Sequence, residues 1–172
     1  MRKLYATLFA AGSLFLSEHL YSQTTVQIGV GSDIPANTLY SPVYRFSATS
    51  TTNGSRSNIL FTQAELAFVG ITHGVTITGV QFNKVNSANF VTPATYSMYM
   101  ANTSNTTLPT TTTWASILAT HTQVYSNNSF NLPLAAGWVT WSLTPFVYTG
   151  GSLEIATECA MAGNGGATDM FQ

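Results

Sequence analysis

The chain has 172 residues, of which 45% are hydrophobic and only 6% are charged, and its formal net charge is −1. This length suffices for one domain with its own core, and the hydrophobic content excludes an intrinsically disordered chain. The near-neutral charge offers no electrostatic attraction for nucleic acid or for an anionic membrane surface.

Residues 1–22 have the pattern of a secretory signal peptide. Arg2 and Lys3 supply a positive start, and an apolar run follows over residues 4–16. Because this run is too short to cross a bilayer as a helix, we expect it to be cleaved and residues 23–172 to form the mature domain. The mature chain is therefore predicted to be secreted or displayed at the outer cell surface, without inserting into a membrane.

Short strands separated by turn residues are predicted through most of the mature chain. They cover residues 24–31, 45–53, 57–61, 75–85, 96–100, 120–125, 138–143 and 153–157. Turns are expected at 126–128 and 150–151, and Gly79 marks a bulge. In the 138–143 strand the alternation places Trp141 inward and Trp138 outward. These features predict an antiparallel β-sandwich, and the length favours a jelly roll.

One short helix is predicted directly after the 57–61 strand. Thr62 and Glu65 have the spacing of a capping box, in which each side chain bonds to the backbone N–H of the other residue. Phe61 and Leu66 flank the box at the positions of a hydrophobic staple. Gly70 tolerates a left-handed backbone and is expected to end the helix after about two turns. Residues 114–119 fit either a helical turn or a loop.

Catalytic chemistry is not indicated by the ionisable residues. Cys159 is the single cysteine, so no internal disulfide is expected. No motif pairs it with His73 or His121, and a buried, inert thiol is the simpler interpretation. Glu154 is expected to face outward on its strand, by alternation. Glu158 would share that face about 13 Å away, which is too far for an acid–base pair at one glycosidic bond. We therefore predict a non-enzymatic protein.

No metal or cofactor is predicted from local spacing. A structural calcium ion is the one alternative, because Asp33 with nearby carbonyls, or Asp169 with Asn164, could supply part of an oxygen ligand set. No spacing resembles a calcium loop, a zinc site or a phosphate site.

Aromatic side chains are the best candidates for a binding surface. Their rings could stack on sugars, with Asn and Thr side chains supplying hydrogen bonds, or they could cover the edges of the sandwich. The candidate ligand contacts are Trp138, Tyr99, Trp114 and Tyr44. Arg56 is given a structural role, either paired with Glu65 or bonded to loop carbonyls.

Six motifs in a fixed order resemble a known bacterial module. They are VQIGVG, SRSNILFTQAEL, GITHGVTITGVQFN, YSMYMANTSNTTL, TWASI and AAGWVTWSLTPFVYTGGSLEIATE, and together they extend from Val26 to Glu158. This run resembles the N-terminal β-sandwich module of large secreted and surface proteins of bacteria that use type IX secretion. The resemblance implies export, an adhesive or binding role, and further domains downstream in the same polypeptide. The tail from Ala160 to Gln172 is Gly- and Ala-rich, whereas a sandwich normally finishes on a strand, so we expect a domain truncated at its C-terminal end.

Two functions are predicted from these features. The first is a non-catalytic secreted or cell-surface module that serves adhesion, binding or spacing in a larger bacterial protein. The alternative is a carbohydrate-binding module attached to a downstream secreted hydrolase or peptidase. The expected partners are the downstream domains and a glycan or surface ligand.

Overall fold

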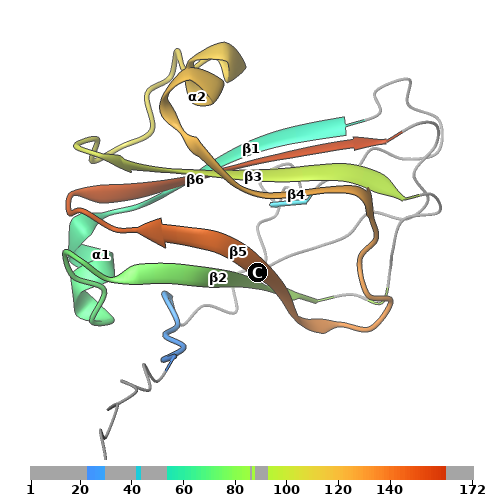
Figure 1. Ribbon diagram of the computed structural model, residues 1–172, viewed down its shortest axis with the longest axis horizontal. Coiled ribbons are helices and arrows are strands. Elements are labelled where there is room, and N and C mark those ends of the chain that lie inside the picture. Colours follow the sequence, from blue (N-terminus) through green and yellow to red (C-terminus); the bar gives the residue numbers. More distant parts are fainter. Residues whose placement is uncertain (1–22, 30–41, 44–53, 86, 88–92, 162–172) are drawn as a thin grey trace, which may run out of the picture.

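The structure is a computed structural model that describes residues 23–29, 42–43, 54–85, 87 and 93–161. The described strands form two packed antiparallel layers (Figure 1). One layer holds β1 (Gly54–Phe61), β6 (Ser152–Met161), β3 (Ala94–Thr103) and β4 (Thr122–Phe130), in that order. The other holds β2 (Thr76–Lys84) and β5 (Gly137–Val147). The predicted antiparallel β-sandwich is therefore confirmed for these residues.

Strand β6 is the centre of the larger sheet because it pairs with β1 on one side and with β3 on the other. Ile155, for example, lies opposite Ile59 of β1 and opposite Met100 of β3. The chain crosses between the layers from β1 to β2, from β2 to β3, from β4 to β5 and from β5 to β6. Side chains on both faces of β6 are buried from Ser152 to Thr157.

The core between the layers is built around aromatic rings. Trp141 of β5 is 1% exposed, and its ring centroid lies 5.8 Å from those of Phe82 and Tyr96 and 6.0 Å from that of Phe130. Tyr96 in turn stacks on Phe130 at 4.7 Å. The inward phase predicted for the 138–143 strand is therefore confirmed. Burial of these rings supplies much of the apolar area that stabilises the sandwich.

One predicted strand and one predicted turn are wrong, and one predicted bulge is confirmed. Residues 23–29 form no strand; instead the Gln23 amide donates to the Thr78 hydroxyl at 3.1 Å. No turn occurs at 126–128, because β4 continues to Phe130 in pairing with β3, and tertiary pairing outweighs the turn preference of Ser and Asn. The register of β2 against β5 shifts at Gly79, as predicted. The prediction for 45–53 lies outside the described residues.

Helix α1 (Gln63–Phe68) begins and ends as the sequence predicts. The Thr62 hydroxyl accepts from the Glu65 N–H at 3.3 Å, and the Glu65 carboxylate accepts from the Thr62 N–H at 2.8 Å. At the other end Gly70 has φ +84, its N–H donates to Ala67 O at 3.0 Å, and the Ile71 N–H reaches Leu66 O at 2.9 Å. These two bonds form a Schellman motif, which gives partners to two carbonyl groups in the last turn of the helix, those of Leu66 and Ala67.

Removal of the Thr62 hydroxyl is expected to lower the free energy of unfolding by about 1 kcal/mol. Hydrogen bonds from the Thr62 hydroxyl and backbone N–H lower the pKa of Glu65 below its usual 4.5. The hydrogen bonds to the Glu65 carboxylate therefore stabilise the fold fully above pH 4.5. This stabilisation is lost as the pH falls through the lowered pKa and the carboxylate is protonated. Thermal melts of Thr62→Ala should differ most from the parent near neutral pH. Thr62→Ser should match the parent; a Thr62→Ala melt that does the same would contradict the assignment.

A second helix, α2 (Trp114–Thr120), settles the alternatives left open for residues 114–119. Thr113 and Ser116 form its capping box: the Thr113 hydroxyl accepts from the Ser116 N–H at 3.2 Å, and the Ser116 hydroxyl oxygen accepts from the Thr113 N–H at 3.2 Å. Figure 1 shows α2 on the outer face of the four-stranded sheet, whereas α1 lies at one end of the sandwich. Within the described residues no helix is long and apolar enough to cross a bilayer.

Lys84 is a buried cation at the end of β2. It is fully buried, and its Nζ donates to Pro133 O at 3.0 Å and to Leu134 O at 3.1 Å. These bonds tie the end of β2 to the β4–β5 connection. A buried ammonium requires such partners because its desolvation is costly.

Candidate functional site

Two of the predicted ligand contacts come together beneath α2. The Trp114 ring lies edge-on to the Tyr99 ring, with centroids 5.7 Å apart, and the Arg56 guanidinium lies 5.0 Å from the Trp114 centroid. Tyr99 is on β3 and Arg56 on β1, so the indole bridges both neighbours of β6. Ala156 of β6, which lies opposite Tyr99, is fully buried. These contacts fasten α2 to the sheet, which favours the packing interpretation for Trp114 and Tyr99.

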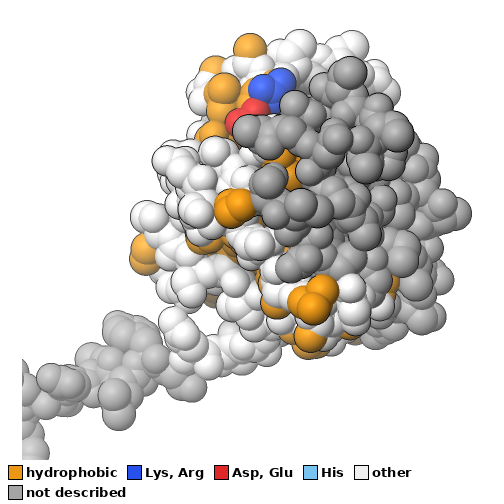
Figure 2. Space-filling view, turned by 90° about the vertical axis from the view of Figure 1, so that its right-hand side faces the viewer, with side chains coloured by type: hydrophobic (Ala, Val, Ile, Leu, Met, Phe, Trp, Pro, Cys, Tyr) orange, Lys and Arg blue, Asp and Glu red, His pale blue; other side chains and the backbone are white. Residues whose placement is uncertain are grey.

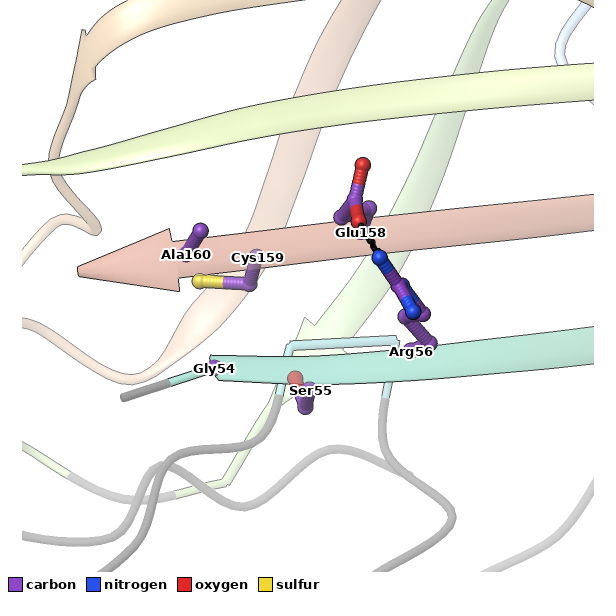
Figure 3. Close-up of a pocket in the computed structure, with 6 residues that line it drawn as sticks. All are labelled: Gly54, Ser55, Arg56, Glu158, Cys159 and Ala160. Atoms are coloured by element: carbon purple, nitrogen blue, oxygen red, sulfur yellow. Dashed lines mark hydrogen bonds and ion pairs between the residues drawn. The ribbon is translucent and has the colours of Figure 1, made fainter. Parts of the chain in front are cut away.

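Arg56 pairs with Glu158, whereas the sequence suggested either Glu65 or loop carbonyls as its partner. Arg56 Nε donates to Glu158 Oε1 at 2.7 Å, and Figure 3 shows the two side chains reaching toward one another from β1 and β6. The two residues are opposite in the ladder, whereas the Glu65 carboxylate is engaged by Thr62. Because the Arg56 side chain is 56% exposed, the pair contributes at most about 1 kcal/mol.

A shallow depression of about 270 Å³ opens beside this ion pair. It is lined by Gly54, Ser55, Arg56, Glu158, Cys159 and Ala160 (Figure 3). Cys159 is only 1% exposed, because it belongs to the inward face of β6, as the simpler interpretation of this thiol predicts. His121 lies beside Glu154 on the opposite face, and His73 lies in the turn before β2. The fold therefore does not unite Cys159 with His121 as a nucleophile–base pair.

Glu154 was expected to face outward with Glu158, but it is 4% exposed. The Asn58 amide donates to its Oε2 at 3.0 Å, and the Asn105 amide donates to its Oε1 at 2.9 Å. Burial by itself would raise the pKa of Glu154, but these hydrogen bonds and the nearby His121 outweigh it and lower the pKa. The carboxyl group is therefore ionised at neutral pH beneath its covering residues.

Trp138 stands apart, on the outer face of the two-stranded sheet. Its side chain is 55% exposed, and its cross-strand neighbour is Asn83. The adjacent pair on the same face is Gln81 and Thr140, whose side chains are hydrogen-bonded at 2.9 Å. These four residues are all uncharged. On the side of the molecule drawn in Figure 2, the described side chains are mostly uncharged, apart from a small basic and acidic area.

The remaining predictions about the site concern residues that the structure does not describe. Tyr44 and the calcium candidates Asp33, Asn164 and Asp169 all lie outside the described ranges. Within those ranges no three His, Cys, Asp or Glu side chains gather in a way that could hold a metal ion. The grouping of His121 with Glu154 was missed, because residues so distant in the chain leave no local spacing signal.

No family model, no curated protein and no solved structure matches this chain. The resemblance to a module of type IX-secreted proteins therefore stays a prediction.

Proposed function

We propose that the chain is a non-catalytic binding module of an exported bacterial protein, serving adhesion or attachment, with further domains downstream. Support comes from the signal-like N-terminus, the order of its motifs, and a mature chain with few charged residues. The contact surface in this proposal is the outer face of β2 and β5, around Trp138. Export by type IX secretion belongs to the same proposal.

The exposure of the Trp138 ring is the observation that carries this proposal. A half-exposed indole keeps a large apolar surface in water, and that surface is released from water when a partner covers it. The tryptophans of the inner face and of α2 are packed, so Trp138 is the one whose ring remains accessible. Tryptophan is also among the residues that contribute most to binding interfaces.

Carbohydrate is the second candidate, favoured by the chemistry around this ring. The face of an indole can stack on the C–H face of a sugar, and Asn83, Gln81 and Thr140 offer neutral donors and acceptors for hydroxyl groups. No charge on these neighbours selects an ionic ligand. In this version the chain directs a downstream hydrolase or peptidase to a neutral polysaccharide.

Trp138→Ala is expected to weaken binding to a neutral polysaccharide at least about tenfold, because it removes the accessible ring. A glycan array followed by titration of the best polysaccharide measures this. Phe68→Ala is the matched control, since Phe68 is 91% exposed on α1, away from the proposed surface, and this variant should bind as the parent does.

Binding that is equal in Trp138→Ala and the parent would reject this contact surface. No binding to any glycan would reject the carbohydrate version. The adhesion version then depends on a second assay, in which beads coated with the parent chain must adhere to bacterial surfaces more strongly than beads coated with Trp138→Ala.

A further inference from the structure

His121 is the C-cap of α2, and its imidazole is buried against β6. The side chain is only 5% exposed, and Nε2 lies 3.3 Å from Oε2 of the equally buried Glu154. At the other side of the ring, Nδ1 lies 2.9 Å from the Thr120 hydroxyl oxygen. That hydroxyl also donates to Ser116 O at 2.8 Å. The ring therefore has a polar partner at each nitrogen.

These three contacts need three hydrogens, and a neutral imidazole leaves only two. The neutral ring carries one hydrogen, and the Thr120 hydroxyl carries one. With the ring hydrogen on Nδ1, the Nε2 lone pair faces the Glu154 carboxylate, which is unfavourable in a buried site. With the ring hydrogen on Nε2, Nδ1 needs the hydrogen of Thr120, and Ser116 O loses its donor. Only the doubly protonated ring supplies every contact, whichever tautomer the neutral ring adopts.

Glu154 is the charged group that faces this ring. Helix α2 and residues 104–113 before it contain no Asp, Glu, Lys or Arg. Strand β3 places Ala101 opposite Glu154. On the same face of the sheet, Arg56 of β1 and Glu158 of β6 form an ion pair with one another, about 13 Å further along β6. The charge that His121 meets is therefore a single carboxylate.

Two amides orient that carboxylate without neutralising it. Asn58 of β1 donates to Glu154 Oε2 at 3.0 Å, and Asn105 donates to Oε1 at 2.9 Å. Neither amide carries a charge, so the carboxylate keeps its negative charge in place beside the imidazole. A protonated His121 brings the compensating positive charge, and a hydrogen bond between two ionised groups is stronger than one between neutral groups.

We propose that His121 is a pH-sensitive latch that holds α2 on the four-stranded sheet. Imidazoles ordinarily change charge between about pH 5 and 8, so acidification in this range adds the hydrogen that pairs the ring with Glu154. The latch contributes stability while the ring is charged and loses it as the pH rises. At lower pH the pair is lost again as Glu154, whose pKa lies below its usual 4.5, takes up a proton. The latch is independent of the Trp138 surface and of the proposed binding function.

Thermal melts of the full chain at pH 8 and pH 6 test the latch. On acidification the melting temperature of the parent should change in the stabilising direction by at least about 2 °C relative to His121→Gln, whose amide takes up no proton. His73→Gln is the matched control, because His73 lies in the turn before β2, and it should follow the parent. Hydrogen exchange locates the effect: after correction for intrinsic rates, the amides of α2 should gain protection at pH 6, whereas those of α1 should not.

Parallel pH profiles for the parent and His121→Gln would overturn the latch, as would a His73→Gln profile that matches the one of His121→Gln. If His121→Gln fails to fold, nitrogen-15 NMR of the parent decides. An imidazole with hydrogens on both nitrogens at pH 6 and on one at pH 8, together with the gain in α2 protection, supports the latch. A ring that stays neutral at pH 6, or α2 protection that does not change as the ring gains its hydrogen, overturns it.

Discussion

Trp141→Ala is expected to lower the free energy of unfolding by about 3–5 kcal/mol, the range measured for truncation of large buried aromatics. The Trp141 ring contacts Phe82 of the same sheet and Tyr96 and Phe130 of the other, so its removal opens a cavity between the layers. A loss of this size is a large share of the stability of an ordinary domain. Denaturant unfolding followed by circular dichroism measures it.

Trp138 supplies a matched control on the same strand. It lies three residues before Trp141, on the opposite face, and is 55% exposed. Trp138→Ala should change the free energy of unfolding by no more than about 0.5 kcal/mol. If Trp141→Ala does not fold, Trp141→Phe should still show a measurable loss. Equal losses for the two alanine variants would contradict the assignment of inner and outer faces.

Features set by neighbouring residues were predictable from the sequence. The capping box at Thr62 and Glu65 and the stop at Gly70 each depend on residues within one helical turn, and all three were placed correctly. The faces of Trp138 and Trp141 follow from the period-2 alternation of a strand, which does not depend on the strand's partner. The sandwich follows from many such strands taken together.

Features set by pairing across the chain were not predictable. Arg56 selects Glu158 because β1 and β6 align them in register, although they are 102 residues apart. Glu154 was expected to face solvent because apolar and polar residues alternate along its strand. The outer face of β6 is covered near Glu154, so both faces are buried from Ser152 to Thr157. Helix α2 was ambiguous because Ser116 stands where a capping box usually has Glu or Gln.

The grouping at Glu154 shows the same limit. Asn58, His121 and Glu154 come from β1, the end of α2 and β6, and only the order of strands in the sheet brings them together. A polar cluster on one helix or loop has a recognisable spacing, whereas a cluster assembled across a sheet has none. The burial of Glu154 and the hydrogen bonds it accepts from Asn58 and Asn105, which only coordinates reveal, identify the grouping.

Gly151→Ala is expected to destabilise the fold by about 2–5 kcal/mol, from a left-handed backbone penalty of about 1–2 kcal/mol and an overpacking cost of about 1–3 kcal/mol. Gly151 has φ +78 in the turn between β5 and β6, and a Cβ there would overlap the backbone oxygen of Thr103. The Tyr148 hydroxyl also donates to Gly151 O, so the turn cannot shift without breaking that bond.

Gly150→Ala separates the two causes, because Gly150 is the adjacent residue and shares the left-handed backbone but not the crowding. Its φ is +99, and the nearest atom to an added Cβ is His73 Cδ2 at 3.9 Å. This variant should lose only the backbone penalty of about 1–2 kcal/mol. Chemical denaturation of both variants gives the difference, which reports the contact between the turn and the end of β3. If Gly150→Ala loses as much as Gly151→Ala, the turn does not pack against Thr103 as the structure shows.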